Sequence, residues 1–207
     1  MTTSVFDLNF FRLINGLAGT DRMLDFVAVF AAKWLIYVLV AAAVWLVLAA
    51  RHHLNDGDRY GQLIDGLIIG LRTTVAVLLC AVDSLVMALA VFRERPFVSL
   101  EGVNLLIDPP FFAKSFPSDH TTLAFAVAVS ILMVNRRLGI PALMVAVVVG
   151  LSRIFVGVHF PLDVLVGAIL GTSWAVAVAV IGKKFDDRGR LSQSLLKKRN
   201  FLTNPSD

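Results

Sequence analysis

Charged side chains are scarce in this sequence. Only 16% of its 207 residues are Asp, Glu, Lys or Arg, whereas soluble domains carry about 25%. This shortage excludes an ordinary soluble domain. The mean hydropathy of +0.79 and the apolar windows of about 20 residues indicate an integral membrane protein. The basic residues lie in loops and in the tail rather than on an aromatic-rich surface, so the net charge of +4 does not predict a nucleic-acid partner.

Cysteine is almost absent as well. The single cysteine, Cys80, excludes an internal disulfide. The N-terminus lacks a basic region followed by a small-residue cleavage site, so no removable signal peptide is expected. Internal repeats, low-complexity runs and domain boundaries are also missing, which predicts a single membrane domain over residues 1–207.

The apolar runs predict an all-α bundle of about five transmembrane helices. The segment 3–19 is amphipathic but too short and polar to span, so residues 1–22 are expected to form an interfacial helix. The spans are expected at 24–50, 62–92, 119–135, 139–157 and 161–182, and a charged tail at 183–207 contains an amphipathic piece at 191–202. Arg72 and Asp83 fall inside the second span and must face protein or water.

The orientation follows from the distribution of Lys and Arg between the two membrane faces. One face carries Arg51, Arg59, Arg136, Arg137, Lys183, Lys184, Arg188, Arg190, Lys197, Lys198 and Arg199. The opposite face carries Arg12, Arg22, Arg93, Arg95 and Lys114. The positive-inside rule therefore places the tail in the cytoplasm and the second face outside.

Polar residues cluster in three segments that this topology brings to the outer face. They are Arg93-Glu94-Arg95-Pro96 after the second span, Pro117-Ser118-Asp119-His120 at the start of the third, and Ser152 to Asp163 between the fourth and fifth. Ionisable residues beside apolar spans are costly, so their gathering on one face indicates a functional site.

Three of these residues suit the binding of a phosphate. Arg95 and Arg153 offer planar, permanently charged forks that match phosphate oxygens. Ser118 stands at the expected N-cap of the third span, where its hydroxyl and the following backbone N–H groups point at the same anion.

Three others suit nucleophilic catalysis. The spacing of four residues lets the Asp163 carboxylate reach one ring nitrogen of His159, which leaves the other nitrogen as a nucleophile. His120 can then protonate the leaving oxygen and later activate water. This scheme requires no metal and no other cofactor, and a metal held by these three residues would lie unfavourably beside two arginines. Each residue alone could be an ordinary interfacial side chain, but their common order, spacing and face favour a site.

In combination, Arg95-Pro96, Pro117-Ser118-x-His120 and Ser152-Arg153-x5-His159-x3-Asp163 resemble the type 2 phosphatidic acid phosphatase family of membrane lipid phosphatases. The resemblance implies that His159 forms a phosphohistidine, that Asp163 orients it and that His120 serves the leaving group. It also implies that the phosphate is held by Arg95, Ser118 and Arg153.

Two positions depart from the family pattern. A lysine usual seven residues before the motif arginine is Ala88 here, and the glycine of Pro-Ser-Gly-His is Asp119. Pro-Ser-Asp-His, Arg95-Pro96-Phe97 and the Ala32-Lys33 pair are similar to undecaprenyl-pyrophosphate phosphatases of the bacitracin-resistance type. This similarity implies a polyprenyl diphosphate substrate and recycling of a cell-wall lipid carrier at the outer face of a bacterial cytoplasmic membrane. Further phosphate-binding candidates are then Lys33, Arg93 and Asp119.

Lys33 could supply the cation that is missing at Ala88. It precedes Arg51 by about 18 residues, or roughly 27 Å along a helix, which puts its ammonium level with the outer motif segments. The alternatives are a lysine that extends towards lipid headgroups and a structural pair with Asp83.

Two other functions stay open at this point. The motifs do not specify the lipid tail, so phosphatidylglycerophosphate, phosphatidate or lipid A could be the substrate. A membrane transporter or channel, with Arg72, Asp83 and Arg153 along its pathway, is the alternative from another class and predicts transport without phosphate release.

Overall fold

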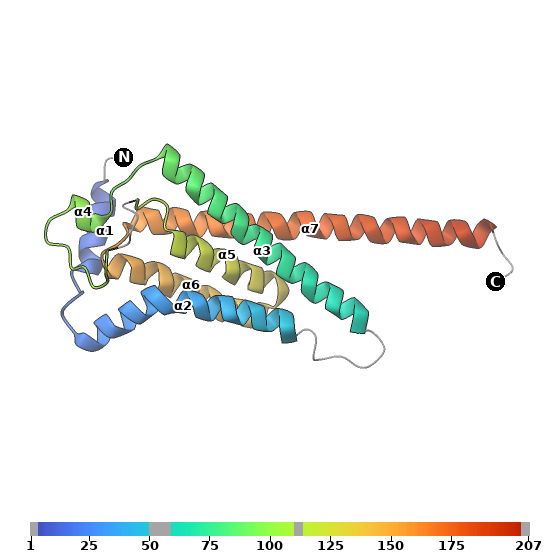
Figure 1. Cartoon of the computed structure of the whole chain (residues 1–207), viewed down its shortest axis with the longest axis horizontal. Coiled ribbons are helices and arrows are strands. Elements are labelled where there is room, and N and C mark those ends of the chain that lie inside the picture. The colour runs from blue at the N-terminus through green and yellow to red at the C-terminus, as the bar shows by residue number, and fades with distance from the viewer. Residues whose placement is uncertain (1–3, 50–58, 110–113, 204–207) are drawn as a thin grey trace.

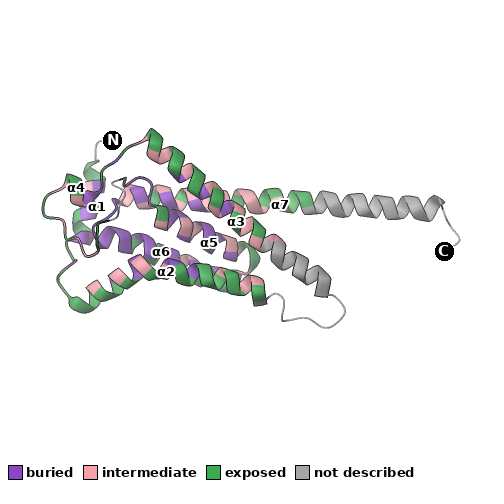
Figure 2. Cartoon of the chain, in the orientation of Figure 1, coloured by how far each residue is buried: buried purple, intermediate pink, exposed green. Residues whose placement is uncertain are grey.

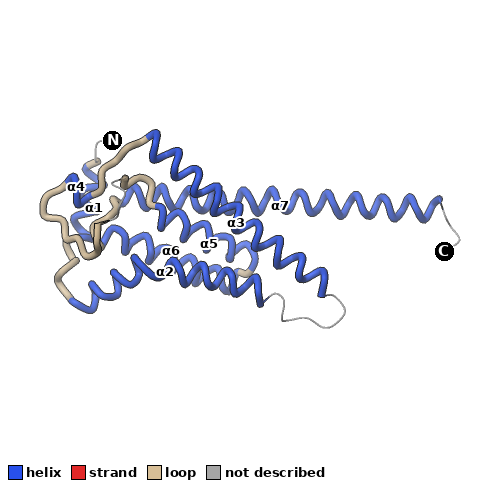
Figure 3. The backbone as a smooth tube through the Cα atoms, viewed as in Figure 1, coloured by secondary structure: helices blue, strands red, loops and turns tan. Residues whose placement is uncertain are grey.

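The computed structural model describes residues 4–49, 59–109 and 114–203, and helices make up most of this part (Figures 1 and 3). They are α1 (Val5–Asn15), α2 (Arg22–Ala49), α3 (Arg59–Ala90), α4 (Pro96–Ser99), α5 (Asp119–Val134), α6 (Arg136–Phe155) and α7 (Pro161–Thr203). Within the described ranges, α2, α3, α6 and α7 are long and apolar enough to cross a membrane, and α5 is a shorter apolar helix. The predicted bundle of about five transmembrane helices is confirmed.

Several helix ends differ from the predicted boundaries. α6 begins at Arg136 rather than 139 because Asn135 caps it, its side chain accepting the N–H groups of Arg137 and Leu138 at 3.0 and 3.3 Å. α7 continues to Thr203, so the predicted tail prolongs the last span instead of forming a separate short helix. The predicted inner-face charges at 51–58, residues 204–207 and the side chains from 186 onward lie outside the described residues.

The shorter helix α5 occupies the centre of the bundle and packs against α2, α3, α6 and α7. The main core consists of Ile36, Leu39, Ala124, Val127, Ala128, Ile131, Ala142, Ala146 and Val149. Many of these residues are small, which lets helix backbones approach closely. On α7, a Cβ added at Gly167 would lie 2.9 Å from the carbonyl oxygen of Ser118. Glycine at this position therefore brings the start of α7 against the start of α5.

Burial changes from the centre of the bundle to its outer faces. Figure 2 shows buried residues concentrated along α5, α6 and the loops at the end of the molecule that holds α1 and α4. The outward faces of α2 and α3 expose large apolar side chains such as Trp34, Trp45 and Leu89. An apolar outer face around a tightly packed centre is the arrangement that a lipid environment favours.

Helix α1 packs one face, which includes two polar residues, against the protein. Asp7, Phe11 and Asn15 are buried, whereas Phe6 and Phe10 are exposed. The Asn15 amide donates to the carbonyl oxygens of Phe155 and Asn104 at 2.8 and 2.9 Å and so ties α1 to the loops beside it. The exposed apolar face suits the predicted interfacial position of residues 1–22, which stays a prediction.

Candidate active site

The three motif segments lie at one end of the bundle, where the loops gather (Figure 3). The Ser115 N–H donates to the Arg93 carbonyl at 2.8 Å and the Ser118 N–H donates to the Asp163 carbonyl at 3.1 Å. Gly157 has φ +86°, a conformation that glycine adopts without strain, and it turns the chain from α6 towards His159. The hydrogen bonds of Ser115 and Ser118 thus join the loop before α5 to the segment after α3 and to the first turn of α7.

His159 is fixed between one acceptor and one donor. Its Nδ1 lies 2.8 Å from the carbonyl oxygen of Ser115, which can only accept, so Nδ1 carries the proton. Its Nε2 lies 3.3 Å from Nη1 of Arg95, which can only donate, so Nε2 presents a lone pair. The neighbours thus select the tautomer in which Nε2 is available as a nucleophile.

The surroundings also keep this ring neutral. His159 is 2% exposed, and burial is the main cause that lowers its pKa from 6.5 to about 4. The positive charges of Arg153 and Arg95 act in the same direction, while the Asp163 carboxylate opposes them. At neutral pH the imidazole is therefore unprotonated at Nε2.

Asp163 contacts the ring less directly than the sequence predicts. Its Oδ2 lies 3.8 Å from Nδ1 of His159, longer than a hydrogen bond. That oxygen instead accepts from Oγ of Ser115 at 2.5 Å and from the N–H of Phe160 at 2.8 Å. Asp163 thus fixes Ser115, whose carbonyl holds the ring. Sequence reasoning missed this role of Ser115, because a backbone carbonyl leaves no residue-type signal.

Arg93 lies between two buried carboxylates. Its Nη1 donates to Oδ1 of Asp163 at 2.6 Å, and its Nη2 donates to Asp7. Its guanidinium also lies 4.1 Å from the centre of the Phe160 ring. Asp7 in turn accepts the Leu162 N–H at 2.9 Å. The predicted phosphate-binding role of Arg93 stays a prediction, and Asp7, in a segment without a motif, is a site residue that the sequence did not reveal.

Arg95 faces Nε2 of the histidine, and the charge of Arg153 also acts on the ring. Arg95 also donates to the Val158 carbonyl at 3.1 Å, and burial lowers its pKa while the Asp119 and Asp163 carboxylates oppose this. Arg153 donates to the Ala32 carbonyl at 3.0 Å, and its buried Nε has no hydrogen-bond partner among the described residues. A buried donor of this kind suits an anion such as phosphate.

The predicted site residues Ser118, Asp119 and His120 lie at the start of α5. Ser118 is the N-cap residue and its Oγ accepts from the Thr121 hydroxyl at 3.0 Å. His120 is half-buried and interacts electrostatically with His159, Arg153 and Arg95. The structure thus brings both histidines into one charged cluster, as a nucleophile and a proton donor would require.

The carboxylate of Asp119 points towards α3 and the preceding loop. It accepts from the Ser84 hydroxyl and lies 3.3 Å from the ammonium of Lys114. The residues that the structure describes contain no group of three or more His, Cys, Asp or Glu arranged to hold a metal ion.

Lys33 lies beside the cluster rather than inside it. Its ammonium is 3.8 Å from Oδ2 of Asp108, and the Lys33 side chain is 41% exposed while that of Asp108 is 99% exposed. The alternative of a pair with Asp83 is wrong, because Asp83 accepts a hydrogen bond from the Trp174 ring at 3.0 Å and Lys33 pairs elsewhere. Lys33 directly follows Ala32, whose carbonyl accepts from Arg153, and it therefore lies close to the site. Its predicted contact with substrate stays a prediction.

Comparison with known proteins identifies the family. Residues 65–187 match the PAP2 superfamily. Undecaprenyl-diphosphatase BcrC of Bacillus subtilis is 34% identical over 181 residues, which cover 86% of this chain and 82% of that protein. Bacitracin transport permease protein BcrC of Bacillus licheniformis is 32% identical over 180 residues, covering 86% and 81%. The crystal structure of Aquifex aeolicus LpxE matches with a TM-score of 0.66 at 28% identity and covers 84% of this chain and 95% of that chain. The matched residues 65–187 include all three motif segments, and this chain belongs to the PAP2 superfamily.

Proposed function

We propose that this membrane lipid phosphatase hydrolyses undecaprenyl diphosphate to undecaprenyl phosphate through a phosphohistidine on His159, at the outer face of a bacterial cytoplasmic membrane. The setting of His159 carries the proposal. A neutral imidazole whose Nε2 faces Arg95 at 3.3 Å, with Arg153 buried nearby, suits attack on a phosphorus atom whose oxygens the two guanidinium groups bind.

In the first step the Nε2 lone pair of His159 attacks the terminal phosphorus. A nitrogen–phosphorus bond forms, the bond between that phosphorus and the bridging oxygen breaks, and its electron pair stays on the bridging oxygen. His120 donates a proton towards this oxygen, and undecaprenyl phosphate leaves. Arg95, Arg153 and the N-terminus of α5 at Ser118 stabilise the charge on the transferred group.

In the second step His120, now a base, takes a proton from water. The resulting oxygen attacks the phosphorus, and the electrons of the nitrogen–phosphorus bond return to Nε2 of His159. Inorganic phosphate leaves and the starting protonation state is restored. The Ser115 carbonyl accepts the Nδ1–H of His159 throughout both steps. Asp163 holds Ser115 in place, because its Oδ2 accepts from the Ser115 hydroxyl at 2.5 Å.

The choice of substrate is supported by a relative and by one residue. The Bacillus subtilis protein that is 34% identical is named an undecaprenyl-diphosphatase. This chain also has Asp119 in the second motif, as the bacitracin-resistance type is expected to have. Other lipid phosphates stay as the alternative within the same chemistry.

A transporter is the alternative from another class, and one relative is named a transport permease. A transporter would need Asp83 of this chain along its pathway. Asp83 instead accepts a hydrogen bond from the Trp174 ring, which suits a structural role better than a water-lined path.

The test is phosphate release from a panel of lipids by the purified protein. Undecaprenyl diphosphate should give the highest kcat/KM among undecaprenyl diphosphate, phosphatidylglycerophosphate, phosphatidate and lipid A, and His159→Ala should abolish release from all of them. A higher kcat/KM with another lipid would overturn the substrate assignment. Full activity of His159→Ala would overturn the mechanism. Transport of a lipid or bacitracin by liposomes that contain the His159→Ala variant would favour the transporter.

A further inference from the structure

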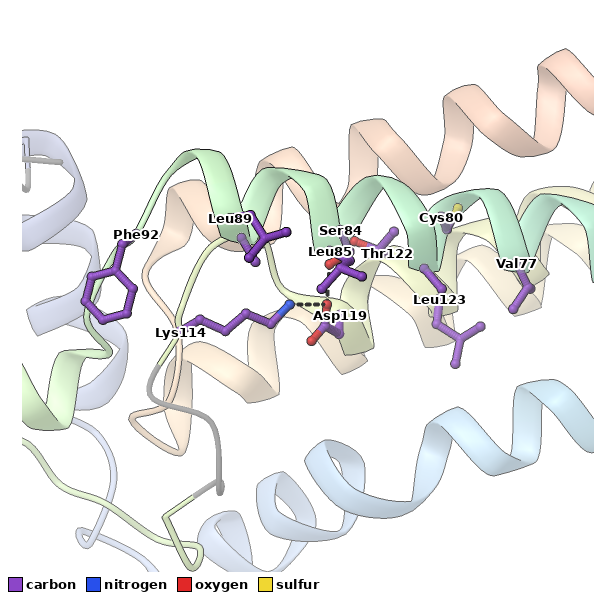
Figure 4. A pocket seen from close by; sticks show the side chains of 12 residues that line it. Val77, Cys80, Ser84, Leu85, Leu89, Phe92, Lys114, Asp119, Thr122 and Leu123 are labelled. Carbon is purple, nitrogen blue, oxygen red and sulfur yellow. Dashed lines mark hydrogen bonds and ion pairs between the residues drawn. The ribbon is translucent and has the colours of Figure 1, made fainter.

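A groove of about 640 Å³ runs between α3 and α5 beside the active site. Its walls are apolar along most of their length, with residues such as Val77, Leu85 and Leu123. Ser84, Lys114 and Asp119 form its polar part, and Figure 4 shows the ammonium of Lys114 directed at the Asp119 carboxylate. The groove therefore passes from a charged pair to a hydrocarbon-like surface.

The position of Lys114 is fixed at both ends. Its backbone pairs with Glu94 in an isolated antiparallel bridge, which places it beside Arg93 and Arg95. Its ammonium lies 3.3 Å from Oδ1 of Asp119, and the same oxygen accepts from the Ser84 hydroxyl. The next residue in the chain, Ser115, contacts Nδ1 of His159. Lys114 is therefore held by its backbone and by its ammonium, and it directly precedes the residue whose carbonyl contacts the catalytic histidine.

The Asp119 carboxylate by itself would repel an anionic substrate. It directly precedes His120 at the start of α5, and its carboxylate faces Ser84 and Lys114. Its pairing with Lys114 neutralises the repulsion and holds a cation at the start of α5. Ala88, where the family resemblance predicts a lysine, lines the same groove and contributes no charge.

We propose that Lys114, positioned by Asp119, binds the lipid-bonded phosphate of a diphosphate substrate and so selects diphosphates over phosphate monoesters. This rests on the proposed function, because only a diphosphate has a phosphate as its leaving group. As the bond to the terminal phosphorus breaks, the electron pair remains on the bridging oxygen, and negative charge develops on the lipid phosphate until His120 has transferred its proton. Lys114 stabilises that charge, and the prenyl chain continues along the apolar groove. A monoester has an uncharged alkoxy group at the same place, and Lys114 contributes little to its hydrolysis.

The test compares undecaprenyl diphosphate with phosphatidate in the same detergent micelles. Lys114→Ala should lower kcat/KM for the diphosphate by about 10- to 100-fold, the loss expected for one charge-assisted contact. It should lower kcat/KM for phosphatidate by less than about threefold, and Lys114→Arg should restore most of the diphosphate rate because it keeps the charge. Asp119→Asn should also reduce the preference for the diphosphate, since the lysine loses its anchor. Arg22→Ala, which removes an exposed cation at the same end of the molecule, is the matched control.

Equal losses on both lipids, or an unchanged preference in Lys114→Ala, would overturn the assignment of Lys114 alone. Thermal unfolding of each variant in detergent identifies a loss that comes from misfolding, and in that case Lys114→Arg alone decides the test. A wild-type enzyme that hydrolyses phosphatidate but not undecaprenyl diphosphate would instead overturn the proposed function, and this inference with it.

Discussion

Asp7→Asn removes one charge from a buried network while it preserves the shape of the side chain. Arg93 lies between Asp7 and Asp163, and all three side chains are at least 96% buried. The asparagine oxygen can still accept the Leu162 N–H that Asp7 holds at 2.9 Å. The substitution therefore tests the charge of Asp7 and leaves its backbone contact in place.

The expected loss of stability follows from this geometry. Removing one partner from a buried ion pair typically costs about 3–5 kcal/mol, because the other charge stays buried without compensation. Arg93 keeps Asp163, so we expect about 3 kcal/mol, the lower end of that range. For a chain of this size about 1 kcal/mol corresponds to 2–4 °C in Tm, so Tm should fall by roughly 6–12 °C. The kcat should fall too, because Arg93 then pairs with the Asp163 carboxylate alone, and Asp163 also holds Ser115 beside the His159 ring.

The single cysteine offers a suitable assay. Cys80 is buried, so a thiol-reactive fluorophore added to the purified protein in detergent reports unfolding as the temperature rises. Glu101→Gln, which also removes one carboxylate charge but on an exposed residue near the same end, is the control and should leave Tm within about 2 °C, since surface substitutions change stability little. A Tm for Asp7→Asn equal to that of the control would refute the view that α1 stabilises the site through this charge.

Four further predictions concern catalysis, pH, specificity and orientation. His159→Ala should abolish hydrolysis and His120→Ala should slow it by about 100- to 10,000-fold with Tm unchanged; EDTA should have little effect, and a loss restored by one added divalent ion would contradict the metal-free scheme. Because the pKa of His159 is about 4 in the folded protein and about 6.5 in an unfolded chain, the unfolded state binds more protons between these values. Tm should therefore fall as the pH is lowered from 6.5 towards 4, and His159→Gln should weaken this dependence; an identical pH profile for the variant would count against it. Lys33→Ala should raise KM for undecaprenyl diphosphate far more than for phosphatidate, whereas equal small effects would leave Lys33 as an interface residue. A membrane-impermeant maleimide should label Glu101→Cys from outside the cell while a reporter fused after Asp207 reads as cytoplasmic, and the opposite pattern would reverse the proposed orientation.

The sequence predicted the architecture well because a membrane span has a local cause. A helix that crosses the hydrocarbon needs about 20 apolar residues whatever it packs against, so the bundle could be recognised from hydropathy. Each crossing reverses the direction of the chain, which predicted that the segments around Arg95, His120 and His159 meet at one end. The ends of helices were harder to predict, because hydropathy marks where the apolar span ends and not where the helix ends. The helix α7 continues beyond its apolar span to Thr203.

The sequence by itself determined the membrane class, the five apolar helices and the set of histidines and arginines at one end. The tertiary structure decided which atoms meet. Spacing predicted Asp163 as the partner of the His159 ring, but the packed loops place the Ser115 carbonyl there, 44 residues away in the chain. Asp7 reaches Arg93 across 86 residues. The periodicity of the sequence predicts only which face of a helix is buried in the protein. The pairing of donors and acceptors depends on how distant segments pack against one another.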